Sequence, residues 1–487
     1  MLFNSFSFLI FFPIVVFLYF VIPVRFRNVW LVVASYFFYM SWNAKYGLLI
    51  AFSTVVTYVC ARLIEAASGM GVKKLVLALC IFINVGILFF FKYLTWLISE
   101  WNTLLGTEYA LPIDIILPVG ISFYTFQALG YTIDVYRGNI AAERNFITYA
   151  LYVSFFPQLV AGPIERSGHL LCQLGTPAGF DRGNAVRGLQ YMLYGYVEKV
   201  VIADNLAIIV DQVYADHGSY GGGILYLTTV LFAFQIYCDF GGYSHIAIGA
   251  AKVLGVDLLQ NFRQPFFARD IKSFWQRWHI SLNKWLVDYI YIPLGGSRCG
   301  RVRRRFNLMV TCLVSGIWHG ASWHYVAWGA VNGLYQIVGE KTDPFYEKLA
   351  KAVRIDTDGR GYVAVQRFVT FNLFVISLIF FRSVSISDSL QVFRSIIFDN
   401  RFLDIFDISK WGIEGIYPAQ ILWVVIAVIL MFIVETIHES GKHISELYIM
   451  KNAFSRIVVY YVVVLFLIVA VTQTFGRSAS AFLYFQF

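Results

Sequence analysis

The chain has 487 residues, of which 59% are hydrophobic and only 14% are charged, and its formal net charge is +9. This composition excludes an ordinary soluble protein and indicates an integral membrane protein, because several continuous apolar runs are long enough to cross a hydrocarbon core as helices. The runs are continuous rather than alternating, which argues against a transmembrane β-barrel. The positive charge is typical of cytoplasmic loops rather than of a nucleic-acid-binding surface.

The first apolar run, 6–22, predicts a retained membrane span. The first residues lack the basic start and the small-residue cleavage site of a signal peptide. Arg25 and Arg27 follow the run at once. Because basic residues favour the cytoplasmic side, the N-terminus is expected outside.

Further apolar runs predict about 11 spans in all, by the hydrophobic-length rule. Pro112 and Pro118 interrupt the segment 111–135 and indicate a kinked or re-entrant piece, which membranes tolerate only inside protein or along a cavity. Residues 340–367 carry charges of both signs and predict a solvated loop. The other runs are, in chain order, 30–42, 46–60, 75–91, 147–161, 186–210, 224–237, 308–328, 323–338, 368–381, 416–437 and 457–475. With no internal repeat or soluble domain evident, residues 1–487 are expected to form a single transmembrane domain.

Two Trp-His pairs are the main chemical signal, Trp278-His279 and Trp318-His319. His319 falls inside the apolar stretch 308–328, and an ionisable group at bilayer depth is a functional candidate by default. The alternative is a structural histidine that is hydrogen-bonded inside a helix bundle. The six cysteines form no C-x-x-C pair, so neither a zinc site nor a disulfide framework is expected. The sequence has no P-loop or dinucleotide-binding motif, and no bound cofactor is expected.

The stretches around these pairs resemble the membrane-bound O-acyltransferase (MBOAT) family, above all its bacterial branch that O-acetylates alginate, peptidoglycan and other surface polysaccharides. The resemblance rests on five stretches of this sequence: WQRWHISLNKWLVDYIYIPLGGS, SGIWHGASWHYVAWG, FFPQLVAGPIER at 155–166, YCDFGGYSHIAIGAAKVLG at 237–255 and FLYFQF at 482–487. It implies an all-α polytopic fold in which about 11 transmembrane helices and some short or re-entrant helices surround a central funnel or tunnel.

The resemblance also implies roles for three site residues. His319 corresponds to the active-site histidine, which would act as the base near a hydroxyl. His279 is its partner, and it either orients the acyl group or holds the helix that follows. Tyr484, in the aromatic tail 476–487, corresponds to a hydroxyl that receives the acyl group as an ester; the alternative for this tail is an aromatic interfacial belt.

An arginine run precedes the second Trp-His pair and consists of Arg298, Arg301, Arg303, Arg304 and Arg305; Arg298 directly follows the PLGGS of the matched motif. Its plain interpretation is cytoplasmic anchoring of the span that follows. Its functional interpretation is docking of coenzyme A phosphates or of a phosphopantetheine arm, for which guanidinium groups are well suited. With this run inside, the alternation of the later spans places the start of the tail 476–487, and therefore the C-terminus, outside.

The expected function is an O-acyltransferase in the bacterial cytoplasmic (inner) membrane, with acetyl-CoA as donor substrate and an extracytoplasmic polysaccharide as acceptor. A separate extracytoplasmic SGNH-type acetyltransferase is the expected protein partner, membrane lipid surrounds the chain, and no nucleic acid is involved. The alternatives are D-alanyl transfer to teichoic acid and a non-enzymatic transporter. The sequence departs from the family at Gly241, where relatives usually have Ser, and at His245, where they usually have Asp, so His245 is not assigned to chemistry.

Overall fold

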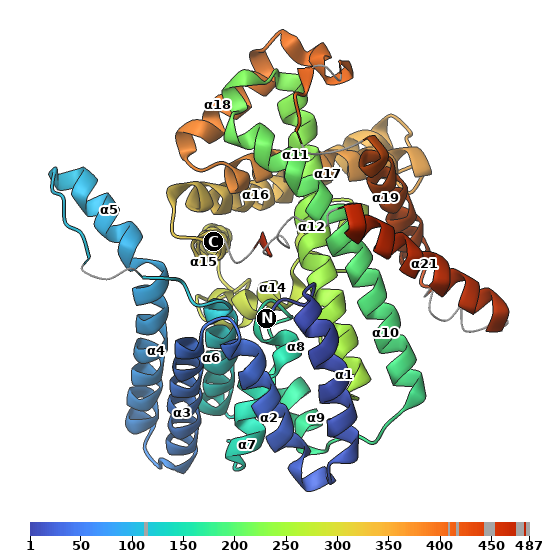
Figure 1. Cartoon of the computed structure of the whole chain (residues 1–487). Helices are drawn as coiled ribbons and strands as arrows, with labels where there is room; N and C mark the ends of the chain where they lie inside the picture. Colours follow the sequence, from blue (N-terminus) through green and yellow to red (C-terminus); the bar gives the residue numbers. More distant parts are fainter. Residues whose placement is uncertain (112–114, 408–409, 415–417, 443–452, 474–481, 484–487) are drawn as a thin grey trace. The chain divides into compact units, whose positions relative to one another are not determined.

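The computed structural model describes the chain except for residues 112–114, 408–409, 415–417, 443–452, 474–481 and 484–487 (Figure 1). Within this described part every regular element is a helix, and no strand is present. The prediction of an all-α protein is therefore confirmed.

The described residues divide into two compact units. The first unit comprises Met1–Tyr194 and Tyr243–Gln260. It contains α1 (Phe6–Val21), α2 (Val24–Met40), α3 (Ala44–Ala66), α4 (Met70–Lys92), α5 (Leu94–Leu105), α6 (Ile121–Arg137), α7 (Phe146–Ser154), α8 (Phe156–Leu159), the π-helix η1 (Ser167–Leu171), α9 (Cys172–Gly175) and most of α10 (Arg182–Tyr196).

The second unit comprises Gly195–Gly242 and Asn261–Leu483. Its first elements are the π-helix η2 (Val197–Ala203), α11 (Asp204–Ala215), the 3-10 turn η3 (His217–Ser219) and α12 (Gly222–Val253), whose last turns belong to the first unit. The others are η4 (Pro265–Phe267), α13 (Ile271–Trp275), α14 (Ile280–Leu286), the π-helix η5 (Val287–Tyr291), α15 (Arg301–His319), α16 (Trp323–Ala352), α17 (Arg360–Arg382), α18 (Ile386–Phe398), η6 (Arg401–Phe406), α19 (Pro418–Glu439) and α21 (Ala453–Gln473).

Several helices begin at residues whose side chains satisfy the free N–H groups of the first turn. Asn43 and Asn145 cap α3 and α7 in this way. Asp270 and Ser273 form a reciprocal capping box at α13, where the Ser273 N–H donates to Asp270 Oδ1 at 2.7 Å. Local sequence therefore fixes where α13 begins, at Ile271, seven residues before Trp278 of the first Trp-His pair.

Five described helices are long and apolar enough to cross a membrane: α3, α4, α12, α17 and Gln420–Glu439 of α19. The shorter α1 is also apolar. This criterion excludes a helix such as α15, whose first turns carry the arginine run. The membrane-spanning character is thus supported, while the count of about 11 spans stays a prediction.

Three expectations about individual segments need correction. The run 147–161 is not one helix, because α7 ends at Ser154 and α8 restarts at Phe156; Pro157 lacks an N–H and its ring would meet the carbonyl of Val153. Most of the predicted loop 340–367 is helical. Residues 340–352 extend α16, because their alanine, leucine, lysine and glutamate side chains favour a helix, and residues 360–367 are the first turns of α17, so only 353–359 connect the two helices. The run 186–210 is interrupted by η2, a wider π turn that carries Glu198 and Lys199.

Candidate active site

His319 is the last residue of α15 and lies at the turn of the α15–α16 hairpin. Its side chain is buried, with 5% of the residue exposed. Three aromatic rings surround the imidazole at close to right angles, at centroid distances of 5.0 Å for Trp318, 5.1 Å for Trp328 and 5.2 Å for Phe381. An aromatic cage of this kind fixes the ring and keeps bulk water away from it.

Glycines allow the two helices of this hairpin to approach closely. A Cβ on Gly316 would lie 2.3 Å from the Tyr325 carbonyl oxygen, and one on Gly329 would lie 2.5 Å from that of Cys312. Neither contact is possible for a larger residue without displacement of a helix. The glycines therefore set the position of the hairpin end at which His319 lies.

His279 occupies a backbone conformation that L-residues rarely adopt, with φ of 44° and ψ of 53°, directly before α14. The surrounding hydrogen bonds hold it there. The Ile280 N–H donates to the Asn261 carbonyl at 2.9 Å, and the Asn283 amide donates to the Trp278 carbonyl at 2.6 Å. A left-handed conformation at a non-glycine residue costs on the order of 1 kcal/mol and persists only where neighbours impose it. Strain of this type is typical of functional sites.

Trp318 brings the two histidines into one site. Its indole lies 5.8 Å from the His279 imidazole and 5.0 Å from the His319 imidazole, measured between ring centroids. The His279 imidazole also lies 4.6 Å from the Phe240 ring of α12, with the two rings nearly perpendicular. The two predicted histidines are thus neighbours of the same indole, and no local sequence pattern indicated that Trp318 or Phe240 would contact them.

Burial decides the protonation state of His279, which lies in the turn between α13 and α14 and is 1% exposed. Removal from water lowers the pKa of His279 to about 3. The ring is therefore neutral at pH 7 and a weak base. This suits an orienting or hydrogen-bonding role better than proton abstraction.

The end of the aromatic tail lies against α12. Phe482 and Leu483 are buried, the Phe482 ring is 5.8 Å from the Phe240 ring, and the Leu483 N–H donates to Asp239 Oδ2 at 2.8 Å. Tyr484 itself lies outside the described residues. Phe240 is thus in contact both with the His279 ring and with the residue two positions before Tyr484.

A buried ion cluster lies next to this contact. Lys199 Nζ is 2.5 Å from Asp239 Oδ1 and 2.7 Å from Asp204 Oδ1. Lys199 comes from the π turn η2, and Asp239 from α12. The charges in the run 186–210 gave a sequence signal for Lys199, but its pairing with Asp239 could not be foreseen.

Arg298 lies in the exposed loop between η5 and α15. The loop is fixed near its glycines, because the Asn307 amide donates to the Gly296 carbonyl at 3.3 Å. Further along the run, Arg304 and Arg305 pair with Glu340 of α16 at 2.8 Å and 3.5 Å. The run therefore includes two arginines that link α15 to α16 and three, Arg298, Arg301 and Arg303, that are exposed to solvent. Among the residues described, no group of three or more histidine, cysteine, aspartate or glutamate side chains could hold a metal ion.

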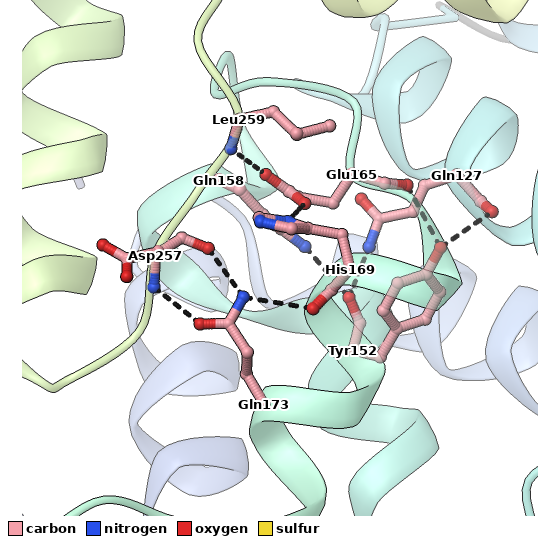
Figure 2. A network of polar contacts seen from close by, with 8 residues as sticks. All are labelled: Gln127, Tyr152, Gln158, Glu165, His169, Gln173, Asp257 and Leu259. Carbon is pink, nitrogen blue, oxygen red and sulfur yellow. Dashed lines mark hydrogen bonds and ion pairs between the residues drawn. The ribbon is translucent and has the colours of Figure 1, made fainter.

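The first unit holds a separate polar network, shown in Figure 2. Glu165 is buried, its Oε2 lies 2.8 Å from His169 Nδ1, and its Oε1 accepts the Leu259 N–H. The hydrogen bond with Glu165 raises the pKa of His169. Gln173 accepts the Asp257 N–H at 2.8 Å and donates to the Asp257 carbonyl at 2.9 Å. The network fixes the extended segment after α12, which leads to Asn261. The partner of the buried Glu165 in this turn is therefore the local residue His169, four positions along the chain.

His245, which the sequence left unassigned, also belongs to the first unit. Its ring lies 5.1 Å from Tyr194 and 6.1 Å from Tyr191. These are contacts of packing against α10, and they give no reason to assign His245 to chemistry.

Comparison with known proteins gives a consistent match. The model of the MBOAT, membrane-bound O-acyltransferase, family matches residues 139–384. A probable alginate O-acetylase of Pseudomonas putida is 31% identical, with 100% of both chains covered. A peptidoglycan O-acetyltransferase of Helicobacter pylori is 32% identical, with 82% of this chain and 80% of that protein covered. A teichoic acid D-alanyltransferase of Streptococcus thermophilus is 26% identical over 54% of this chain and 68% of its own length.

Proposed function

Because this chain belongs to the membrane-bound O-acyltransferase family, we propose that it takes an acetyl group from cytoplasmic acetyl-CoA and delivers it outward for O-acetylation of an extracytoplasmic polysaccharide. The protein is a membrane-embedded O-acyltransferase. The observation that carries the proposal is Trp318 in contact with both the His279 and the His319 imidazoles, inside the region that matches the family. A transporter would need no such pair of caged imidazoles.

His319 is the proposed general base. In the first transfer it accepts the proton of an attacking hydroxyl, whose oxygen forms a bond to the thioester carbonyl carbon. The carbon–sulfur bond then breaks, and the leaving thiolate takes the proton from His319, so that free coenzyme A thiol departs and the imidazole is neutral again. His279, neutral at pH 7, orients the acyl group in this step.

Tyr484 is the proposed acceptor of the first transfer. The position of the two preceding residues supports this assignment, because Phe482 lies against Phe240 and Phe240 lies against His279. In the second transfer an outer hydroxyl attacks the tyrosyl ester, the new ester forms, and the phenol leaves with one proton. A phenol of pKa about 10 is a better leaving group than an alcohol, so the intermediate stays reactive.

Arg298 is the proposed docking residue for the coenzyme A phosphates. Its exposure and its place in a loop fixed by Asn307 support this role, since a guanidinium recognises phosphate in a bidentate manner. The proposed reaction requires that the arginine run lies on the cytoplasmic side of the inner membrane and that both termini lie outside. An extracytoplasmic SGNH-type acetyltransferase is the proposed partner that passes the acetyl group to the polymer.

The test uses purified protein in proteoliposomes. Thiol release is measured with acetyl-CoA and, in parallel, with a D-alanyl thioester. Acetyl-CoA should be consumed, and Arg298→Ala should raise the KM for acetyl-CoA with little change in kcat, whereas Arg301→Ala is the matched control. Consumption of the D-alanyl donor alone would favour D-alanyl transfer. Consumption of neither donor, with or without the polymer acceptor, would contradict the enzymatic assignment.

A further inference from the structure

The two oxygens of the Asp239 carboxylate have different partners, a lysine ammonium group and a backbone N–H of the tail. Oδ1 lies 2.5 Å from Lys199 Nζ, and Oδ2 accepts the Leu483 N–H at 2.8 Å. Asp239 is 3% exposed and Lys199 is 4% exposed. This single side chain therefore connects α12, the π turn η2 and the C-terminal tail.

Stability alone does not account for this arrangement. A buried ion pair repays its desolvation only in part, and an apolar pair of similar volume is often equally stable. The hydrogen bond from the Leu483 N–H gives Asp239 a second function. A buried backbone N–H needs an acceptor, and a carboxylate oxygen is a strong one. Lys199, itself held by Asp204 at 2.7 Å, fixes the carboxylate so that Oδ2 is presented to the tail.

Phe240, the residue after Asp239, shows that the hydrogen bond between Asp239 and Leu483 lies beside the candidate site. The Phe240 ring lies 4.6 Å from the His279 imidazole and 5.8 Å from the Phe482 ring. Leu483, which Asp239 holds, is the residue directly before Tyr484. An anchor at this position fixes the point from which the chain continues to Tyr484.

We propose that Asp239 is a positioning residue, whose carboxylate, set by Lys199, docks the tail backbone at Leu483 beside the histidine site. In its link to catalysis the inference rests on the proposed role of Tyr484 as acyl carrier. The docking itself is a separate claim, and it can be measured without any turnover.

The experiment measures docking by thiol labelling in the full-length protein. All six native cysteines are replaced, and a Leu483→Cys reporter keeps the backbone N–H while it marks a buried position. The test variant is Lys199→Met/Asp239→Leu, which replaces the ion pair by an apolar pair and leaves no buried charge of this pair behind. N-ethylmaleimide should label the reporter about tenfold faster or more in this variant, since a charge-assisted hydrogen bond is lost.

Two controls separate docking from folding. Asp204→Asn removes a charge next to Lys199 but keeps an oxygen that accepts from its Nζ, and it leaves the acceptor of the Leu483 N–H unchanged, so labelling should stay near the parent rate. A second reporter, Ala427→Cys, is buried in α19 rather than in the tail and should stay protected in every variant. If the double variant also exposes the Ala427→Cys reporter, Asp239→Asn replaces it as the test variant. Asparagine offers the Leu483 N–H a neutral and therefore weaker acceptor. Labelling of the Leu483→Cys reporter should then be faster while Ala427→Cys stays protected.

Activity gives the second readout. In the double variant kcat for acetyl transfer should fall while the KM for acetyl-CoA stays unchanged, because the donor site is not altered. Unchanged labelling of the Leu483→Cys reporter in a folded test variant would overturn the inference. If Tyr484→Phe keeps full activity while the labelling result holds, the acyl-carrier role fails and the docking role of Asp239 stands.

Discussion

At the scale of single residues, His279 is the clearest case of backbone strain beside chemistry. Its φ of 44° is imposed by two hydrogen bonds, from the Ile280 N–H to the Asn261 carbonyl and from the Asn283 amide to the Trp278 carbonyl. Its ring contacts those of Phe240 and Trp318. The backbone conformation favours glycine, whereas the residue present is histidine. The ring must therefore contribute something that outweighs the conformational cost.

Two substitutions at this position separate strain from chemistry. We expect His279→Gly to unfold at a higher temperature than His279→Ala, because only glycine adopts the left-handed region freely, a difference on the order of 1 kcal/mol. Both variants should lose most acetyl transfer, since both lack the ring. Thermal unfolding in detergent, followed together with turnover, checks this; equal or reversed melting temperatures would show that the site does not impose the strain.

At the scale of elements, the α15–α16 hairpin is the rigid support of His319. Its close packing depends on glycines that face carbonyl oxygens of the opposite helix. Packed helices respond to an inserted methyl group by shifting, and such overpacking typically costs about 1–3 kcal/mol. The position of His319 should therefore respond to changes several turns away from it.

Gly329→Ala tests this support without touching either histidine. The new Cβ would lie 2.5 Å from the Cys312 carbonyl oxygen, so the helices must separate. We expect a lower melting temperature and a clear loss of kcat. The matched control is Gly361→Ala in α17, where a Cβ meets nothing within 4 Å. Loss of activity in the control to the same extent, or full activity of Gly329→Ala, would argue against the hairpin as the positioning element.

Sequence patterns predicted the helices better than the contacts between them. Apolar runs predicted most of the helices, because that signal is local, but the breaks at Pro157 and at η2 inside two of the runs were missed. The extension of α16 past residue 340 was missed, since charged side chains on an exposed helix resemble a loop. The pairing of Asp239 with Lys199, and the placing of Trp318 between two imidazoles, depend on contacts between distant segments, which no local pattern contains.

At the scale of the whole molecule, the proposal requires one orientation in the membrane. The arginine run must face the cytoplasm, where acetyl-CoA is found, and the tail must begin on the outer side. The described spans are consistent in length with a membrane protein but do not by themselves give a direction. Orientation is therefore an independent requirement of the proposed reaction.

Labelling of single cysteines in whole cells tests the orientation. In a background without the native cysteines, Arg303→Cys should resist an impermeant maleimide until the membrane is opened, because it lies in the exposed part of the run. Thr103→Cys, exposed in α5 beyond the span α4, should react in intact cells and serves as the outer control. Reaction of Arg303→Cys from outside would invert the topology.

The central claim is that His319 activates a tyrosine of the tail to take up the acyl group, and trapping that ester tests it most directly. Purified protein is mixed with isotopically labelled acetyl-CoA, quenched in acid, digested and analysed for label on the C-terminal peptide by mass spectrometry. The wild type should carry the label on Tyr484, Tyr484→Phe should carry none, and His319→Ala should acquire it about 10²-fold more slowly or worse. His324→Ala, which removes another buried histidine of the same hairpin, should acquire it at close to the wild-type rate. Labelling of His319→Ala at the wild-type rate, or polymer acetylation by Tyr484→Phe at the wild-type rate, would contradict the account.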